Sequence, residues 1–266
     1  WNDGIGGILR YGIPEFRLPK SILDRYQSKL EDLGIHIRPN TTIGAVLMID
    51  NLFRDGYKSV FIGTGAEKPK SLGIRGETLG NVYFGLNYLA NPQGHKLGDR
   101  VAVIGMGNAA MDVARTALRQ GARHVILFAR GKRIMASSNE VDYARLDGAE
   151  FVFGKQIQYI DENGPVFKTS IFDEEGHIVG FEEELEHIHA DSVIISVSQM
   201  PRKKLVRTTD GLQADDRGNL IIDDQFMTTR PGVFAAGDVT TGPKTVVHAV
   251  EAAKQAAEAM DAYMRV

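Results

Sequence analysis

The sequence predicts an α/β fold, and three stretches of the chain support that prediction. Residues 101–130 read as an apolar strand, a glycine-rich turn, a helix and a second strand. Residues 58–65 and 232–238 each read as a short apolar strand that runs into a glycine turn, and a long Ala-rich helix follows the second of them. Apolar residues recur at the strand period and then at the helix period, which is the pattern of alternating β and α structure. The 266 residues suffice for one large domain or two ordinary ones.

The glycine-rich turn is the most informative motif. It reads Gly105-Met106-Gly107-Asn108-Ala109-Ala110 and matches G-x-G-x-x-G/A. Gly105 allows a tight turn, Gly107 has no Cβ that would keep a pyrophosphate away, and Ala110 lets the helix pack close to the strand. The start of the helix then presents unpaired N–H groups and a partial positive charge to the phosphates. A chance turn is the alternative, but the flanking strands and helix favour a dinucleotide-binding unit.

The end of the second strand indicates which dinucleotide is bound. It reads Ala129-Arg130-Gly131-Lys132-Arg133, at the place where an NAD-binding unit usually carries Asp or Glu for the ribose 2′-OH. Cations attract a 2′-phosphate, and an arginine can bind it with two hydrogen bonds. The sequence therefore favours NADP(H) over NAD(H), and the alternative is a solvated basic loop.

The N-terminal third is expected to be partly irregular. Residues 4–19 contain two prolines, which argue against a helix and favour an extended loop. A helix is expected over 21–33, with Ser21 as its cap and Gly34 at its end. Beyond it we expect short strands at 35–37 and 58–62, a connector at 77–88 and a linker at 91–94.

The C-terminal half is expected to contain a strand-rich stretch and a last long helix. The expected elements are a helix at 135–146, strands from 151 onward with turns at 161–164 and 173–176, an acidic solvated edge at 182–186, an apolar strand at 191–197 and a helix at 245–260. His187 and His189 share one strand face, but a third ligand is not evident, so surface histidines are favoured over a metal site. Asp238, which follows Gly237 at a strand end, can hold a polyhydroxyl chain beside the helix start at Thr245. A capping aspartate beside a packing helix is an equal alternative.

Composition excludes several classes of protein. The net charge is −3 and no long basic tract is present, which argues against nucleic acid and against a membrane as partners. The chain has no cysteine, so it holds no redox-active disulfide, no thiolate metal site and no cysteine-ligated iron–sulfur cluster. A cytoplasmic location agrees with this composition. Because the chain begins at Trp1 on a stretch that reads like the middle of a domain, we expect it to be a piece of something longer.

Four stretches together carry a family resemblance. They are GGILRYGIPEFRLPK at 6–20, FIGTGAEKP at 61–69, VAVIGMGNAAMDVARTALRQGA at 101–122 and GVFAAGDVTTGPKTVVHAVEAAKQAA at 232–257. In this order they resemble the glutamate synthase small-subunit family of FAD/NADPH oxidoreductases, which is also represented by the flavin module of dihydropyrimidine dehydrogenase and by NADH-dependent ferredoxin:NADP oxidoreductase. The match runs over nearly the whole chain, and GIPEFRLP is specific to this family.

The resemblance implies two Rossmann-like domains. An NADPH-binding domain at 99–198 would be inserted into a discontinuous FAD-binding domain at 1–98 and 199–266. The family's own N-terminal βαβ unit, with its G-x-G-x-x-G for FAD, and a cysteine-rich iron–sulfur region are missing from this sequence, so the FAD domain is expected to be incomplete. A second departure is Ser198, which stands where the family carries glycine in a turn before a proline.

The resemblance also implies a set of cofactor-binding residues and no catalytic acid, base, nucleophile or metal ligand. On the flavin they would be Gly7, Ile8, Arg17, Ile43, Gly237, Asp238, Thr245 and Val246. On NADPH they would be Met106 to Ala109 at the pyrophosphate, Arg130 and Arg133 at the 2′-phosphate, and Ser196, Val197 and Ser198 beside the nicotinamide half.

The implied activity is hydride transfer from NADPH to FAD N5, with electrons passed on to iron–sulfur centres of a partner such as the glutamate synthase large subunit. One alternative is the same flavoprotein module serving another acceptor, such as ferredoxin or a pyrimidine-reducing domain. A further alternative is a nucleotide-binding fragment without turnover. Thioredoxin-reductase chemistry is excluded because the chain has no C-x-x-C pair.

Overall fold

The computed structural model describes residues 3–265, which form two compact units. Unit 1 contains the residues up to Gly7, the segment Leu23–Lys68 and the residues from Gln199 onward. Unit 2 contains Ile8–Ile22 and Pro69–Ser198. Among the described residues, none of the helices has both the length and the apolar character that a membrane span requires.

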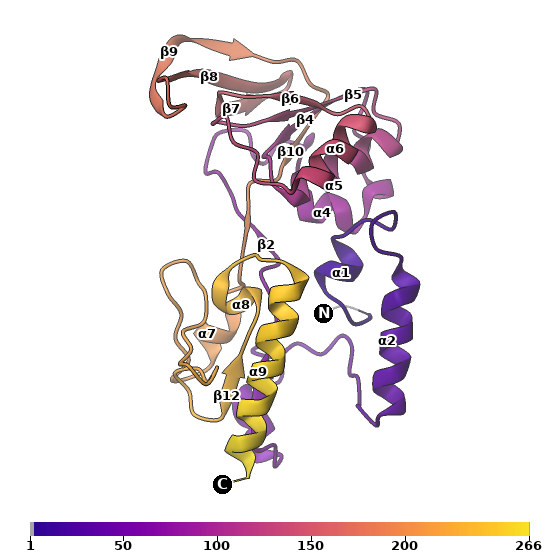
Figure 1. The fold of residues 1–266 in the computed structure, drawn as a ribbon, viewed down its shortest axis with the longest axis vertical. Coiled ribbons are helices and arrows are strands. Elements are labelled where there is room, and N and C mark those ends of the chain that lie inside the picture. The colour runs from indigo at the N-terminus through magenta and orange to yellow at the C-terminus, as the bar shows by residue number, and fades with distance from the viewer. Residues whose placement is uncertain (1–2, 266) are drawn as a thin grey trace. The chain divides into compact units, whose positions relative to one another are not determined.

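Unit 2 is built on a five-stranded parallel sheet with the order β3-β10-β4-β5-β6 (Figure 1). The strands are β3 (Val82–Phe84), β10 (Ser192–Ile195), β4 (Arg100–Ile104), β5 (His124–Phe128) and β6 (Glu150–Val152). Since all five run in one direction, the residues that follow β4, β5 and β10 meet at the same edge of the sheet. In open α/β sheets this carboxyl edge is where ligands bind.

The two faces of this sheet are covered differently. Helices α4 (Gly85–Ala90), α5 (Asn108–Arg119) and α6 (Ser138–Leu146) cover one face, and the antiparallel sheet of β7 (Lys155–Asp161), β8 (Gly164–Phe172) and β9 (Ile178–His187) covers the other (Figure 1). Side chains of β4 alternate between the two cores: Val103 packs with Met111 of α5, whereas Ile104 packs with Phe167 of β8. Unit 2 also holds α1 (Ile8–Tyr11) and the 3-10 turn Pro92–Gly94.

Unit 1 contains a parallel pair, β1 (Val60–Ile62) with β12 (Val233–Ala235). Its core joins residues from four stretches of sequence: Ile49, Ile62, Leu212, Leu220, Val233, Ala235 and Val239. The helices of this unit are α3 (Ile49–Arg54), α7 (Lys204–Thr208), α8 (Asp238–Thr241) and α9 (Val246–Met264). The helix α2 (Lys20–Asp32) begins in one unit and ends in the other, and β2 (Lys68–Pro69) and β11 (Gln199–Met200) lie where the chain passes between them.

The α/β class is confirmed, and the local differences from the sequence predictions have physical reasons. The stretch 77–88, expected as a connector, forms β3 and α4, because Val82–Phe84 pairs with the much later strand β10. No strand forms at 35–37, where Ile35 is 48% exposed. One helical turn, α1, forms within the stretch expected to be irregular, and it lies before the first proline. The acidic run lies on the exposed edge strand β9, as expected.

The units also divide the chain differently from the domains implied by the resemblance. The later boundary falls at 198/199 in both, but the earlier one lies at 68/69 rather than 98/99, and residues 8–22 pack with unit 2. The reason is that 69–98 supplies an edge strand and a covering helix to the five-stranded sheet. Which cofactor each unit binds stays a prediction.

Candidate functional site: glycine turns at two strand ends

The glycine turn of unit 2 begins where β4 meets β10. Gly105 has φ +136°, and a Cβ built on it would lie 2.2 Å from the carbonyl oxygen of Ser196. The Ser196 N–H donates to the Ile104 carbonyl at 2.8 Å, and the Gly105 N–H donates to the Phe128 carbonyl at 3.0 Å. Only glycine can occupy this position, because both the backbone angle and the approach of Ser196 exclude a side chain.

The second glycine of the turn faces open space. Gly107 precedes α5 with an extended conformation (φ −93°), and a Cβ built on it would have no neighbour within 4 Å. Gly107, the N-cap residue, has no side chain that could cap the helix start, and Ala110 is fully buried against the sheet. The first N–H groups of a helix have no partner within the helix. This opening at a helix start fits a phosphate group.

The basic loop that follows β5 is tied to this turn. The Met106 carbonyl accepts the N–H groups of Met135 and Ala136, both at 3.0 Å, and Asn108 Oδ1 accepts the Ser137 N–H at 3.0 Å. Within this loop the side chains of Arg130 and Arg133 are exposed. A further hydrogen bond, from Ser170 Oγ to the Arg130 carbonyl at 3.0 Å, anchors the start of the loop to β8.

The third part of this edge is the chain end of β10. Ser196 lies between two glycines, since a Cβ on Gly85 would come within 2.9 Å of its Oγ. Val197 follows, half buried, and then Ser198 with φ +145°, an angle that residues with a side chain rarely adopt. Ser198 therefore holds a backbone conformation that favours glycine, at a cost of about 1–3 kcal/mol.

Unit 1 carries a turn of glycine followed by aspartate, Gly237-Asp238, after β12. Gly237 (φ +78°) precedes α8, and its Cα faces Ala249 of α9. The Asp238 carboxylate accepts the Lys244 N–H at 3.0 Å, and burial raises the pKa of this carboxyl while that hydrogen bond opposes the rise. The next helix, α9, starts after Thr245, whose Oγ1 lies 2.6 Å from His248 Nδ1, and Val246 is 48% exposed.

The remaining residues implied for the flavin are far apart in the sequence and are divided between the two units. Gly7 has φ +47°, and a Cβ on it would lie 3.1 Å from Glu67 Oε1 within unit 1. Ile43 pairs with Leu47 in an isolated bridge beside the unit 1 core. Ile8 begins α1 in unit 2. Their roles in flavin binding stay predictions.

Arg17 has partners that the sequence did not indicate. Its guanidinium binds Asp112 Oδ2 at 2.7 Å and Glu140 Oε1 at 2.8 Å, both within unit 2. Sequence reasoning missed this cluster because Arg17 and Asp112 are 95 residues apart and no local pattern connects them.

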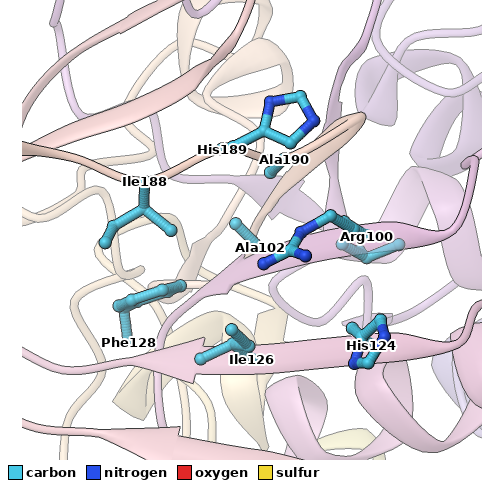
Figure 2. Close-up of a pocket in the computed structure, with 9 residues that line it drawn as sticks. Arg100, Ala102, His124, Ile126, Phe128, Ile188, His189 and Ala190 are labelled. Atoms are coloured by element: carbon cyan, nitrogen blue, oxygen red, sulfur yellow. The ribbon is translucent and has the colours of Figure 1, made fainter.

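A narrow cavity lies on the face of the five-stranded sheet that is covered by β7, β8 and β9 (Figure 2). It is lined by Arg100, Val101, Ala102, His124, Ile126, Phe128, Ile188, His189 and Ala190. Its volume is about 10 Å³, the room that one water molecule needs, so this cavity does not hold a nucleotide. The nearby His187 bonds Asp161 Oδ1 through Nε2 at 3.0 Å.

Comparison with known proteins gives the class. A family model described as pyridine nucleotide-disulphide oxidoreductase matches residues 44–253, and the chain belongs to that family. Although the family name includes a disulphide, this chain has no cysteine.

Within the family the chain is similar to the glutamate synthase small chains. The glutamate synthase [NADPH] small chain of Halomonas elongata is 33% identical, over 98% of this chain and 61% of the relative. The NADP(+)-dependent formate dehydrogenase subunit beta of Moorella thermoacetica is 34% identical, over 98% of this chain and 39% of the relative. The NAD-dependent dihydropyrimidine dehydrogenase subunit PreT of Escherichia coli O157:H7 is 32% identical, over 97% and 60%. The chain thus spans about 60% or less of the length of these relatives.

Solved structures share the fold. Mycobacterium tuberculosis FprA in complex with NADPH superposes with a TM-score of 0.72 at 20% identity, over 97% of this chain and 74% of that one. Thioredoxin reductase of T. acidophilum superposes with a TM-score of 0.62 at 26% identity, over 79% and 66%.

Proposed function

We propose that this chain is part of an NADPH-dependent FAD oxidoreductase of the glutamate synthase small-subunit type. The observation that carries the proposal is the glycine turn of unit 2. There an open position at Gly107 meets a helix start, and a loop with two exposed arginines is hydrogen-bonded beside it. A flavin bound by such a protein supplies the redox chemistry, accepting a hydride from the nicotinamide and releasing electrons singly.

The residues of unit 2 fit the dinucleotide. The N–H groups at the start of α5 would bind the pyrophosphate, which can approach because Gly107 has no side chain. Arg130 and Arg133 would bind the 2′-phosphate, and the absence of a carboxylate at this strand end disfavours the free 2′-OH of NAD. Ser196 to Ser198 would run beside the nicotinamide half, since they leave the same edge of the sheet.

The residues of unit 1 fit the ribitol and ring end of a flavin. The Asp238 carboxylate, at the end of β12, can accept hydrogen bonds from sugar hydroxyls. The start of α9 at Thr245 and Val246 offers N–H groups and a partial positive charge to the pyrimidine edge of the ring. The resemblance alone adds Gly7 and Ile43 of unit 1 to the proposed flavin contacts, and it also implies Ile8 and Arg17, which belong to unit 2.

The first test is the visible absorption spectrum of the purified protein with FAD, before and after addition of NADPH. A flavin spectrum that bleaches with NADPH supports the oxidoreductase. Binding of NADPH by a colourless protein would leave a nucleotide-binding module without turnover, which is the alternative from another class of function.

Cofactor choice has its own test. Replacing Arg130 and Arg133 by alanine should weaken NADPH binding well over tenfold, because each charge-assisted phosphate contact contributes about 1.5–3 kcal/mol. Binding of NADH should hardly change. The matched control removes two exposed charges elsewhere on unit 2, Arg123 and Arg145, which pair with Asp99 and Asp142. Equal losses for both nucleotides would exclude these arginines as the 2′-phosphate site.

The electron acceptor is proposed to be an iron–sulfur centre of a partner subunit or domain, such as the glutamate synthase large subunit. The relatives named as subunits of formate dehydrogenase and dihydropyrimidine dehydrogenase favour a second candidate, in which the same module serves another acceptor. Identification of the subunit that co-purifies with the native protein separates the two.

A further inference from the structure

Arg17 lies against the beginnings of two helices of unit 2. Its Nη1 donates to Asp112 Oδ2 at 2.7 Å, and its Nη2 lies 2.8 Å from Glu140 Oε1. Asp112 is in the second turn of α5, and Glu140 is in the first turn of α6. The two carboxylates are largely buried, with side-chain exposures of 5% and 13%. One guanidinium therefore bridges two helices through two charge-assisted hydrogen bonds.

The segment that carries Arg17 has its own internal support. Lys20 Nζ donates to the Leu9 carbonyl at 2.8 Å and also to the Ile13 carbonyl. The Glu15 carboxylate accepts the Lys20 N–H at 3.2 Å, at the start of α2. The neighbouring Phe16 ring lies beneath the guanidinium groups of two α5 arginines, at 4.6 Å and 4.5 Å. Arg17 is therefore presented to α5 and α6 from a fixed backbone.

The two bridged helices begin at the two parts of the proposed NADPH site. Helix α5 starts directly after the glycine turn, and α6 starts directly after the basic loop that carries Arg130 and Arg133. The turn and the loop are already joined by the hydrogen bonds from residues 135–137 to Met106 and Asn108. By binding Asp112 and Glu140 together, Arg17 joins the starts of the two helices beside the Arg115–Glu140 pair (3.4 Å), and it thereby helps to fix the position of the loop.

Charge balance shows why this bridge matters. Burial raises the pKa of Asp112 to about 6, the Arg17 guanidinium opposes that rise, and the Glu140 carboxylate adds to it. Arg115 and Lys20 are the other charged groups that act on Asp112. In the described part of the chain, Asp112 Oδ1 is buried without a hydrogen-bond partner. Without Arg17, Asp112 and Glu140 would each lose a close cationic partner in a poorly solvated place, and the link between the two helix starts would weaken.

We propose that Arg17 is a positioning residue for NADPH selectivity: by bridging Asp112 and Glu140 it holds the loop of Arg130 and Arg133 where the 2′-phosphate binds. The inference rests on the proposed NADPH site. It assigns to Arg17 a role within unit 2 that is distinct from contact with the flavin, and it predicts an effect on the 2′-phosphate without direct contact to it.

The test compares dissociation constants for NADPH and NADH in the purified protein and in Arg17→Lys. Lysine keeps the charge but cannot bind two carboxylates with a planar fork. We expect the NADPH constant to rise about tenfold, as for other small misplacements of a binding group, and the NADH constant to stay within about twofold. The matched control is Arg123→Lys, because the Arg123–Asp99 pair, at 3.6 Å, lies outside the Arg17 segment and outside α5 and α6. It should leave the ratio of the two constants unchanged.

The outcomes separate the inference from the function on which it rests. A wild-type protein without preference for NADPH would overturn the proposed 2′-phosphate site. A wild-type preference that persists in Arg17→Lys would overturn the inference alone. If Arg17→Lys does not fold, the same two dissociation constants are measured for Glu140→Gln. This variant keeps the Arg17–Asp112 pair and removes the charge on the α6 side. It should lower the preference for NADPH over NADH in the same way.

Discussion

The variants Gly105→Ala and Gly107→Ala should differ in which property they change, the stability of the protein or its affinity for NADPH. At Gly105 the added Cβ would meet the Ser196 carbonyl oxygen at 2.2 Å, and the φ of +136° would be strained for any residue with a side chain. At Gly107 the added Cβ would meet nothing within 4 Å, and the φ of −93° is ordinary. The first variant should therefore lose stability, and the second should lose only affinity for NADPH.

The magnitudes follow from these distances. Strain at a glycine-only φ costs about 1–3 kcal/mol, and forcing the backbone of β4 away from β10 costs about 1–3 kcal/mol more. Gly105→Ala should thus destabilise the protein by about 4 kcal/mol, a large part of the ~5–15 kcal/mol that holds a native protein together. Gly107→Ala should change the unfolding free energy by less than about 1 kcal/mol, since φ there suits alanine. Its methyl group would occupy the path of the pyrophosphate, so NADPH affinity should fall at least about tenfold.

Urea unfolding followed by circular dichroism, together with NADPH titration of each folded variant, measures both properties. Gly121→Ala is the matched control, because Gly121 also has a positive φ (+102°) but a Cβ there would have no neighbour within 4 Å. The unfolding free energy of Gly121→Ala should fall only by the cost of the backbone strain, about 1–2 kcal/mol. The reasoning is refuted if Gly105→Ala loses no more stability than Gly121→Ala, or if Gly107→Ala binds NADPH as tightly as the wild type.

Three other predictions concern Ser198 and Asp112. Ser198→Gly should raise the unfolding free energy by about 1 kcal/mol, because φ +145° suits glycine, and a loss in urea unfolding would contradict this. The pKa of Asp112, raised from 3.8 to about 6, means that its contribution to stability is full below about pH 4 and is lost as the pH rises through 6. The stability lost over this pH range is about 3 kcal/mol. Asp112→Asn should therefore abolish the pH dependence of the urea midpoint between pH 4 and 6. An unchanged pH dependence would show that another group titrates there. Arg17→Met should raise the pKa of Asp112 above 6, which carboxyl-carbon NMR would detect, and a lower value would contradict the ion pair.

Prediction from the sequence succeeded where the signal is local. The run from β4 through α5 to β5 follows from apolar periodicity and the glycine turn, and the structure contains the strand, the helix and the second strand in that order. The edge strand β3 was missed because Val82–Phe84 is too short for a period to be visible, and only its register with β10 makes it a strand. Conversely, Ile35-His36-Ile37 alternates apolar and polar residues as a strand does, but the structure forms no strand there.

The candidate site likewise has parts that the sequence predicts and parts that only the structure shows. The glycine turn and the basic loop could be predicted because their residues are contiguous, and their hydrogen bonds to each other bring the two together. The bridge made by Arg17 could not, since its carboxylates come from helices about 95 and 120 residues away in the chain. The roles implied for the flavin depend on family resemblance and remain predictions.

The reason for the first glycine of the motif is itself a tertiary one. A tight turn alone explains why Gly105 is favoured, but the structure adds a contact from a third stretch of sequence, the Ser196 backbone at the end of β10. The same serine approaches Gly85, so the residue after β10 is packed between two glycines that lie before it in the chain. Because β10 lies between β3 and β4, any side chain at Gly105 or Gly85 would push β10 out of its place in the sheet. Gly105 and Gly85 are therefore the residues that allow β10 to enter the sheet, whereas Gly107 leaves the helix start open.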